Sequence, residues 1–206
     1  MIDNPVKQPP RRYMILGSQS PRRKEILQFF TLPFSQIPSH FDEDQIPFTG
    51  DPAEYALQLA QKKGELLLEQ FPSELIITAD TVVYLNGKIY NKPKHQEEAT
   101  LFLRELSGQW HEVVTGVCIT TNEKRESQTE STKILFNQLS EQHITQYLSH
   151  LAFSDKAGGY AIQQGGGIIV SKIEGCYYNV MGLPLNTLSQ LLLAFEIDLW
   201  QHLKIF

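Results

Sequence analysis

A β-rich run from Leu75 to Leu85 meets a tight-turn signal, and this junction limits the possible folds more than any other feature of the sequence. Asn86-Gly87 follows the run, and Lys88-Ile89-Tyr90 follows the turn. Asn-Gly between two β-rich segments is the strongest short-range signal for a two-residue hairpin, and a hairpin joins antiparallel strands. The chain is therefore neither an all-helical bundle nor a purely parallel sheet.

Two strong helix starts add α-structure to this hairpin. Tyr13 to Leu16 predicts a short strand, and the turn after it ends in Ser20-Pro21, a capping residue followed by proline at the first helical position. Asp51-Pro52-Ala53-Glu54 combines a cap, a proline and a capping-box glutamate. Other segments are expected to be helices over Glu97–Leu106, Ser140 to about Leu151 and Pro184–Phe195, and strands over Val113–Thr121 and Ser131–Phe136. We predict an α/β fold whose mixed, twisted sheet is flanked by helices.

The length and composition are those of a folded globular protein. Charged residues make up 20% of the 206 residues and hydrophobic residues 41%, far from the composition of a disordered chain. This length suits one domain, which we expect over residues 13–206 after a loose tail over residues 1–12. The formal net charge of −5 argues against general nucleic-acid binding, which needs a broad basic face.

The sequence also indicates a cytoplasmic protein. It contains no apolar run that could serve as a signal peptide, and no stretch of about 18 apolar residues that could span a membrane. Cys118 and Cys176 are too few for a disulfide framework and lack the paired spacing of a zinc site. We therefore expect a reducing compartment and no membrane partner.

The first candidate site is the turn Ser18-Gln19-Ser20-Pro21-Arg22-Arg23 between the first strand and the first helix. A helix N-terminus offers unpaired N–H groups, and hydroxyl and guanidinium groups lie within the same few residues, as in a phosphate-binding site. An ordinary Ser-Pro helix start with solvated arginines fits this segment equally well.

The second candidate is Asp80, a single carboxylate inside the apolar run Thr78–Val83. A buried carboxylate is costly unless it is paired, binds a metal or faces a cleft, and this favours a functional role. Backbone hydrogen bonds at a strand end are the alternative. His111 is expected to be a packed polar residue, and Tyr177 and Tyr178 are expected to lie in the core.

Together these segments resemble the Maf family of nucleoside triphosphate pyrophosphatases, from about Met14 to Leu193. The matching motifs are Leu16-Gly17-Ser18-Gln19-Ser20-Pro21-Arg22-Arg23, Ala79-Asp80-Thr81-Val82-Val83, Asn91-Lys92-Pro93, Leu106-Ser107-Gly108 with His111 and Val113 to Val117, Asp155-Lys156-Ala157-Gly158-Gly159-Tyr160-Ala161-Ile162-Gln163 and Asn179-Val180-Met181-Gly182-Leu183-Pro184. The resemblance implies a two-lobed architecture with a central cleft, and commonly a homodimer. It also implies an enzyme that hydrolyses a nucleoside triphosphate to the monophosphate and pyrophosphate with a divalent cation, Mg²⁺ or Mn²⁺.

The resemblance also implies roles for individual residues. Asp80 matches the catalytic carboxylate of the family. Four positions match phosphate-binding residues: Ser18, Arg23, Lys63 and Lys92. Three carboxylates match metal-binding positions: Glu43, Asp80 and Asp155. Three positions match those that separate the dTTP/UTP-acting branch from the 7-methyl-GTP-acting branch, and all three side with dTTP and UTP: Arg22, Thr81 and Gln163.

The chain departs from the family pattern at Gly17, where alanine is usual, and over residues 151–154, where a Glu-Pro pair usually precedes Asp155-Lys156. A function of another class is a nucleotide-binding regulator of cell division or septum formation with little turnover, because family members have also been linked to septum formation. Release of pyrophosphate would support the enzyme, and tight nucleotide binding without release would support the regulator.

Overall fold

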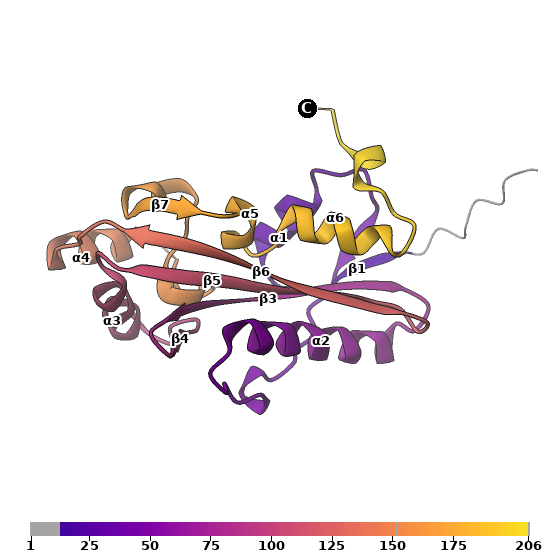
Figure 1. The fold of residues 1–206 in the computed structure, drawn as a ribbon, viewed down its shortest axis with the longest axis horizontal. Helices are drawn as coiled ribbons and strands as arrows, with labels where there is room; N and C mark the ends of the chain where they lie inside the picture. Colours follow the sequence, from indigo (N-terminus) through magenta and orange to yellow (C-terminus); the bar gives the residue numbers. More distant parts are fainter. Residues whose placement is uncertain (1–12, 151, 206) are drawn as a thin grey trace, which may run out of the picture.

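A computed structural model describes residues 13–150 and 152–205 of the chain. The predicted loose tail, residues 1–12, and Leu151, the expected end of one helix, lie outside the described residues. Long strands run through the length of an elongated molecule, and helices cover both faces of the sheet (Figure 1).

The sheet has seven strands in the order β2-β1-β3-β5-β6-β7, and β4 pairs with β3 beside this path. The strands are β1 (Met14–Leu16), β2 (Phe34–Gln36), β3 (Leu75–Leu85), β4 (Lys88–Tyr90), β5 (Trp110–Thr120), β6 (Arg125–Phe136) and β7 (Val170–Glu174). β1 is parallel to β2 and β3, and the other pairs are antiparallel. The structure confirms the predicted mixed sheet and the β3–β4 hairpin.

Helices lie on both faces of this sheet. They are α1 (Pro21–Leu27), α2 (Pro52–Gln70), α3 (Gln96–Leu106), α4 (Glu141–Ser149), α5 (Tyr177–Val180) and α6 (Leu185–Leu193). In Figure 1, α2 lies below β3, and α1, α5 and α6 lie above the strands. Asp51 caps α2 through the backbone N–H groups of Ala53 and Glu54, as its sequence predicts.

The alternation of side chains along β3 places two neighbouring polar residues on opposite faces. Ile76 and Val82 pack into the clusters under α2, whereas Ile77 and Val83 belong to the main core on the other face. Successive strand residues point to opposite faces. Asp80 therefore faces the side of α2, and its neighbour Thr81 faces the side of α1 and α5.

A glycine in β5 lets α2 lie close to the sheet. Gly116 is the register partner of Asp80, and a Cβ atom on it would lie 2.5 Å from the carbonyl oxygen of Ala56 in α2. Any larger residue would push the helix outward. This close packing brings Lys63 of α2 within reach of Asp80.

A change of partner along β3 opens the cleft. Residues 75–77 of β3 pair with β1, and residues 83–85 pair with β4. Among the described residues, no strand pairs with residues 78–82 on that edge, and β5 pairs with them on the other. The elements around β1 and those around β4 diverge here, with Asp80 and Thr81 between them.

Several boundaries differ from those that the sequence predicts. β6 begins at Arg125, not Ser131, because the polar residues 125–130 continue the backbone pairing with β5 although they lack an apolar alternation. Tyr177 was expected in the core, but it is 41% exposed, so that expectation is wrong.

Candidate active site

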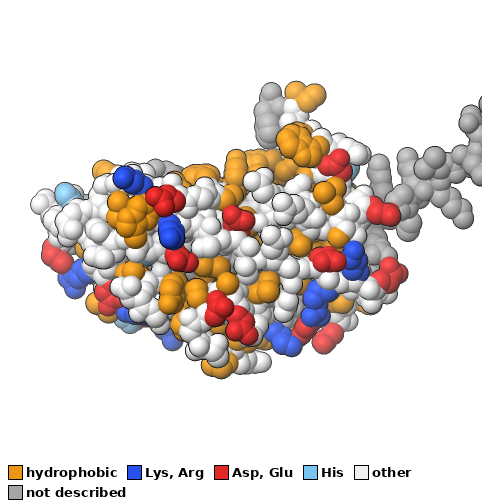
Figure 2. Space-filling view, in the orientation of Figure 1, with side chains coloured by type: hydrophobic (Ala, Val, Ile, Leu, Met, Phe, Trp, Pro, Cys, Tyr) orange, Lys and Arg blue, Asp and Glu red, His pale blue; other side chains and the backbone are white. Residues whose placement is uncertain are grey.

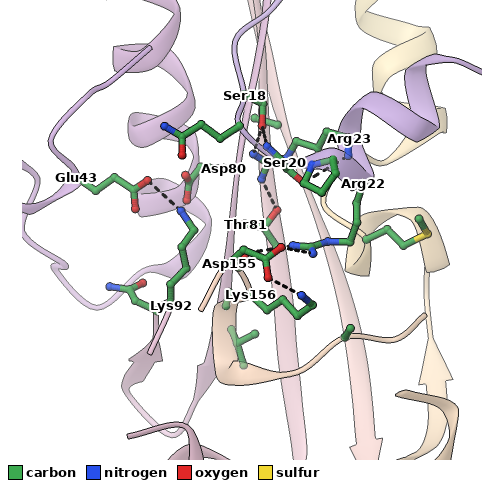
Figure 3. A pocket seen from close by; sticks show the side chains of 18 of the residues that line it. Ser18, Ser20, Arg22, Arg23, Glu43, Asp80, Thr81, Lys92, Asp155 and Lys156 are labelled. Carbon is green, nitrogen blue, oxygen red and sulfur yellow. Dashed lines mark hydrogen bonds and ion pairs between the residues drawn. The ribbon is translucent and has the colours of Figure 1, made fainter. Parts of the chain in front are cut away.

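All of the candidate residues line one cleft of about 460 Å³, at the gap beside β3 (Figure 3). They are Ser18, Arg22, Arg23, Glu43, Lys63, Asp80, Thr81, Lys92, Asp155 and Gln163. They come from segments far apart in the sequence, and the fold places them around the middle of β3.

An ammonium group joins two carboxylates on the α2 side of the cleft. Lys63 is buried, and its Nζ donates to Asp80 Oδ1 and, over 2.8 Å, to Glu43 Oε1. Lys92 reaches the same Glu43 oxygen at 3.5 Å from the β4 side. Asp80 itself is only 5% exposed, so its charge is balanced by Lys63 rather than by bulk water.

These charges shift the pKa values of the cluster. Burial alone would lower the pKa of Lys63, but Asp80 and Glu43 outweigh it and the pKa is raised. Burial would raise the pKa of Glu43, but Lys63 and Lys92 outweigh it and the pKa is lowered. Lys63 stays cationic and Glu43 stays anionic at neutral pH.

Arg23 is fixed on the opposite side of β3 by three different partners. Its Nε donates to the carbonyl of Gly182 (2.6 Å), Nη1 to Ser18 Oγ (3.1 Å) and Nη2 to Thr81 Oγ1 (2.9 Å). Gly182 has φ +101°, and a Cβ on it would lie 3.3 Å from Arg23 Nε, so glycine suits both the backbone and the contact. Burial lowers the pKa of Arg23, with opposing effects from Asp80 and Glu43, but the guanidinium remains charged.

A second ion pair crosses the mouth of the cleft. Arg22 Nη1 donates to Asp155 Oδ2 (2.7 Å), and Nη2 donates to the Asp155 carbonyl (3.1 Å). Lys156 binds the other carboxylate oxygen of Asp155. Burial would raise the pKa of Asp155, but Lys156 and Arg22 outweigh it and lower the pKa. The pair ties α1 to the segment that leads to Gln163.

The three residues expected to set the base preference differ in the hydrogen bonds that their side chains already make within the protein. Arg22 is held by Asp155, and Thr81 Oγ1 lies 2.9 Å from both Arg23 Nη2 and Thr115 Oγ1. In the part of the chain that the structure describes, the carboxamide of Gln163 makes no hydrogen bond, although the residue lines the cleft. Gln163 therefore keeps its donor and acceptor available for a ligand.

The three expected metal ligands are not brought together. Glu43 and Asp80 meet at Lys63, whereas Asp155 pairs with Arg22 and Lys156 on the other side of Thr81 (Figure 3). No group of three or more histidine, cysteine, aspartate or glutamate side chains that could hold a metal ion occurs among the described residues.

Sequence reasoning missed part of the surroundings of the cleft. Thr115 lies opposite Thr81 in the register and donates to the carbonyl of Asn179 over 3.1 Å. Tyr160 lines the cleft and its hydroxyl lies 2.8 Å from Nε2 of His111, which is buried as expected. The sequence predicts both strands, but the register that places Thr115 opposite Thr81 is known only from the structure.

The face of the molecule drawn in Figure 2 carries charges of both signs. On the face drawn in Figure 2, Lys and Arg side chains are interspersed with Asp and Glu. Within the described ranges, no helix has the length and apolar composition that crossing a bilayer requires.

Comparison with known proteins gives consistent matches over most of the chain. A protein-family model described as "Maf-like protein" matches residues 13–195. The "dTTP/UTP pyrophosphatase" of Chlamydia caviae is 47% identical over 191 residues, which cover 92% of this chain and 97% of that protein. A protein of the same description from Pyrococcus furiosus is 48% identical over 180 residues, 87% of this chain and 93% of that protein.

Two further matches differ in name or in strength. The "Nucleoside triphosphate pyrophosphatase" of Chlamydia muridarum is 44% identical over 191 residues and covers 92% of this chain and 97% of that protein. Among solved structures, the Ham1 protein of Staphylococcus aureus aligns at 15% identity with a TM-score of 0.45, over 61% of this chain and 72% of that chain.

Proposed function

The chain belongs to the Maf-like protein family, and from this membership we propose that it is a pyrophosphatase that hydrolyses dTTP and UTP to the nucleoside monophosphate and pyrophosphate. One observation carries the proposal: Asp80 lies in the cleft between cationic groups from both sides of β3, Lys63 on one and Arg23 on the other. A carboxylate between fixed cations suits water attack on a polyanion.

We assign the activation of the attacking water to Asp80. Attack at the α-phosphorus needs a group that accepts the proton of water while negative charge grows on the departing pyrophosphate. Asp80 is held by Lys63 in one orientation, so little reorganisation is needed before reaction. Its burial keeps competing bulk water away.

We assign the β- and γ-phosphates to the cations. Arg23 and Ser18 form one rigid group, and Lys63 and Lys92 form another around Glu43. Charge-assisted hydrogen bonds to phosphate would stabilise the pyrophosphate leaving group. The net charge of −5 repels a polyphosphate at long range, so binding depends on these local cations.

The carboxylate oxygens of Glu43 and Asp80 are ligands of the type that a divalent cation such as Mg²⁺ binds. Each carboxylate uses one oxygen for Lys63, so its other oxygen could bind a cation, and Mg²⁺ typically uses one or two carboxylates together with substrate phosphates. When bound, Mg²⁺ or Mn²⁺ supplies neutralisation of the phosphate charge. Asp155 instead holds Arg22, and we assign it a role in shaping the mouth of the cleft.

We assign recognition of the base to Gln163. Uracil and thymine present an N3–H donor beside an O4 acceptor, and a carboxamide can meet both at once. Cytosine can pair with a flipped amide, so CTP and modified pyrimidine nucleotides would be weaker substrates. The reaction would take place in the cytoplasm, where the unpaired Cys118 and Cys176 stay reduced.

Pyrophosphate release from a panel of nucleotides tests the proposal. Purified protein is incubated with UTP, dTTP, CTP or 7-methyl-GTP, with and without Mg²⁺ or Mn²⁺. We expect turnover of UTP and dTTP, less of CTP and least of 7-methyl-GTP, and a loss of activity when the metal is chelated. Nucleotide binding without release of pyrophosphate would overturn the assignment.

A further inference from the structure

The backbone beside Gln163 is attached to the rest of the molecule by a tyrosine hydroxyl. Tyr147, half-buried on α4, donates to the carbonyl oxygen of Ala161 and accepts from the Ala161 N–H, both over 3.2 Å. One hydroxyl therefore satisfies both backbone groups of a residue two positions before Gln163. Ala161 belongs to none of the described strands, and the hydroxyl supplies partners for its two backbone groups.

A second attachment lies next to the first. The Tyr160 hydroxyl and His111 Nε2 are 2.8 Å apart, both residues are buried, and their rings pack edge to face at 5.5 Å. Phe136 packs against each ring with centroids 4.7 Å away. His111 belongs to β5, so this contact fixes the segment to the sheet that carries Asp80.

We propose that Tyr147 and the Tyr160–His111 pair are positioning residues that hold the Gln163 carboxamide at the place where the base binds. The proposal rests on the proposed reading of the base by Gln163. A flexible carboxamide reads two neighbouring groups of a base only if its backbone is fixed, because each extra conformation reduces the bound fraction. Neither tyrosine hydroxyl needs to touch the nucleotide for this role.

Removal of the Tyr147 hydroxyl tests the proposal. In Tyr147→Phe we expect KM for UTP, and Kd for its non-hydrolysable α,β-imido analogue, to rise about 5- to 10-fold, because the freed backbone would present the carboxamide correctly in only about a tenth to a fifth of the molecules. We expect kcat to stay within about twofold, because Asp80 and Lys63 lie on other elements. Tyr13→Phe is the matched control, since the Tyr13 hydroxyl lies 2.8 Å from Ser35 Oγ away from this segment.

A double-mutant cycle separates positioning from general destabilisation. In a Gln163→Ala background, Tyr147→Phe should change Kd by less than about twofold, because the carboxamide that it positions is gone. Equal effects in both backgrounds would overturn the proposal. Tyr160→Phe should likewise raise Kd in the wild-type background and have little effect in the Gln163→Ala background. It replaces Tyr147→Phe in the cycle if Tyr147→Phe does not fold.

The two measurements also keep this proposal separate from the proposed function. Coupling in the binding of the imido analogue decides whether Tyr147 positions Gln163, and pyrophosphate release by the wild type decides whether the protein is an enzyme. If Tyr147 and Gln163 are coupled in binding of the imido analogue but the wild type releases no pyrophosphate, the proposed function is wrong and the positioning role of Tyr147 still holds.

Discussion

Asp80 and Thr81 have different roles in the cleft because successive side chains of a strand point to opposite faces of the sheet. Asp80 points to the face of α2 and meets Lys63, while Thr81 points to the other face and contacts Arg23 and Thr115. In the proposed function, Asp80 activates the attacking water, whereas Thr81 supports Arg23, one of the phosphate-binding groups. A change at one position should therefore affect a different kinetic constant from a change at its neighbour.

Asp80→Asn should leave a folded protein with little activity. An amide cannot accept the proton of water, and loss of a general base typically lowers the rate by about 10² to 10⁴. Lys63 keeps Glu43 as a partner, so the ammonium is not left unpaired. Steady-state release of pyrophosphate from UTP measures the loss, with the exposed Asp44→Asn as control. A folded Asp80→Asn protein with near wild-type turnover would remove Asp80 from the mechanism.

Gln163→Glu should weaken the use of UTP and dTTP. A carboxylate faces O4 of the base with no proton to donate, and an unpaired buried polar group costs about 1 to 3 kcal/mol. This corresponds to a loss of roughly 5- to 150-fold in kcat/KM. Kinetics on UTP, dTTP, CTP and 7-methyl-GTP measure the ranking of the substrates. If that ranking is the same in the variant, Gln163 does not read the base.

The sequence predicted which residues line the cleft better than what each of them contacts. The motif resemblance placed Arg22, Thr81 and Gln163 at one site, and all three line the cleft. It did not predict that Arg22 is held by Asp155, because that contact joins residues 133 positions apart across the cleft. Such long-range pairing depends on the assembled fold, and local spacing carries no information about it.

At the scale of elements, the contact between α2 and β5 decides whether Lys63 can reach Asp80. Three apolar residues on the inner side of α2, Ala56, Leu59 and Leu67, are fully or almost fully buried. The depth of the contact depends instead on Gly116, which offers no side chain to hold the helix away. Helix and strand are thus packed backbone against backbone at the level of the site.

Gly116→Ala should displace α2 and reduce both stability and activity. The new methyl group would lie 2.5 Å from the Ala56 carbonyl oxygen, and overpacking of this kind typically costs 1 to 3 kcal/mol, with about this loss expected here. Urea unfolding measures the loss. Gly165→Ala is the matched control, because nothing lies within 4 Å of its new Cβ. Equal unfolding midpoints for the two variants would contradict the close-packing argument.

Burial of His111 in β5 should lower the free energy of unfolding at acidic pH. Burial lowers the pKa of His111 from 6.5 to about 4, so between these values the unfolded chain binds a proton that the folded chain does not. Stability therefore increases as pH rises through this window, and the folded protein loses roughly 3 kcal/mol on going from pH 7 to pH 4.

Urea unfolding at pH 7 and pH 4 checks this expectation. In His111→Gln, which does not titrate there, the difference in unfolding free energy between the two pH values should shrink by most of that amount. The carboxylates are common to both proteins, so their contribution cancels in the comparison. An unchanged pH dependence in the variant would assign the acid sensitivity to other groups.

The element boundaries show what local patterns can predict. Both ends of β3 and the cap of α2 agree with the sequence, because the Asn86-Gly87 turn and Asp51-Pro52 are local signals. The start of β6 does not agree, because its first six residues, 125–130, are held by pairing with β5 and not by an apolar face. Strand pairing is a property of two segments, and one segment alone does not reveal it.

At the scale of the whole molecule, the cleft is assembled from both sides of the sheet gap. Arg23 comes from the side of β1 and Lys92 from the side of β4, with Asp80 between them. A nucleotide that contacts both sides would add to the few connections across the cleft, such as the Arg22–Asp155 ion pair. Its binding should consequently stabilise the fold as a whole.

The imido analogue of UTP should raise the melting temperature in the presence of Mg²⁺. A ligand at 100 times its Kd stabilises the folded state by about 2.7 kcal/mol, which for a chain of this length corresponds to a rise of roughly 5 to 10 °C. Differential scanning calorimetry measures it. Lys92→Ala should give a smaller rise at the same ligand concentration, and an equal rise would place the triphosphate away from the β4 side.

The three long strands β3, β5 and β6 pass without a break beneath both sides of the cleft. Proteins that close around a ligand by hinge bending absorb the motion in a few loop residues, whereas here three hydrogen-bonded strands would have to bend together. The width of the cleft is thus part of the fold. In the proposed function, a change of nucleotide preference would therefore come from the residues that face the base, Arg22, Thr81 and Gln163, rather than from a wider cleft.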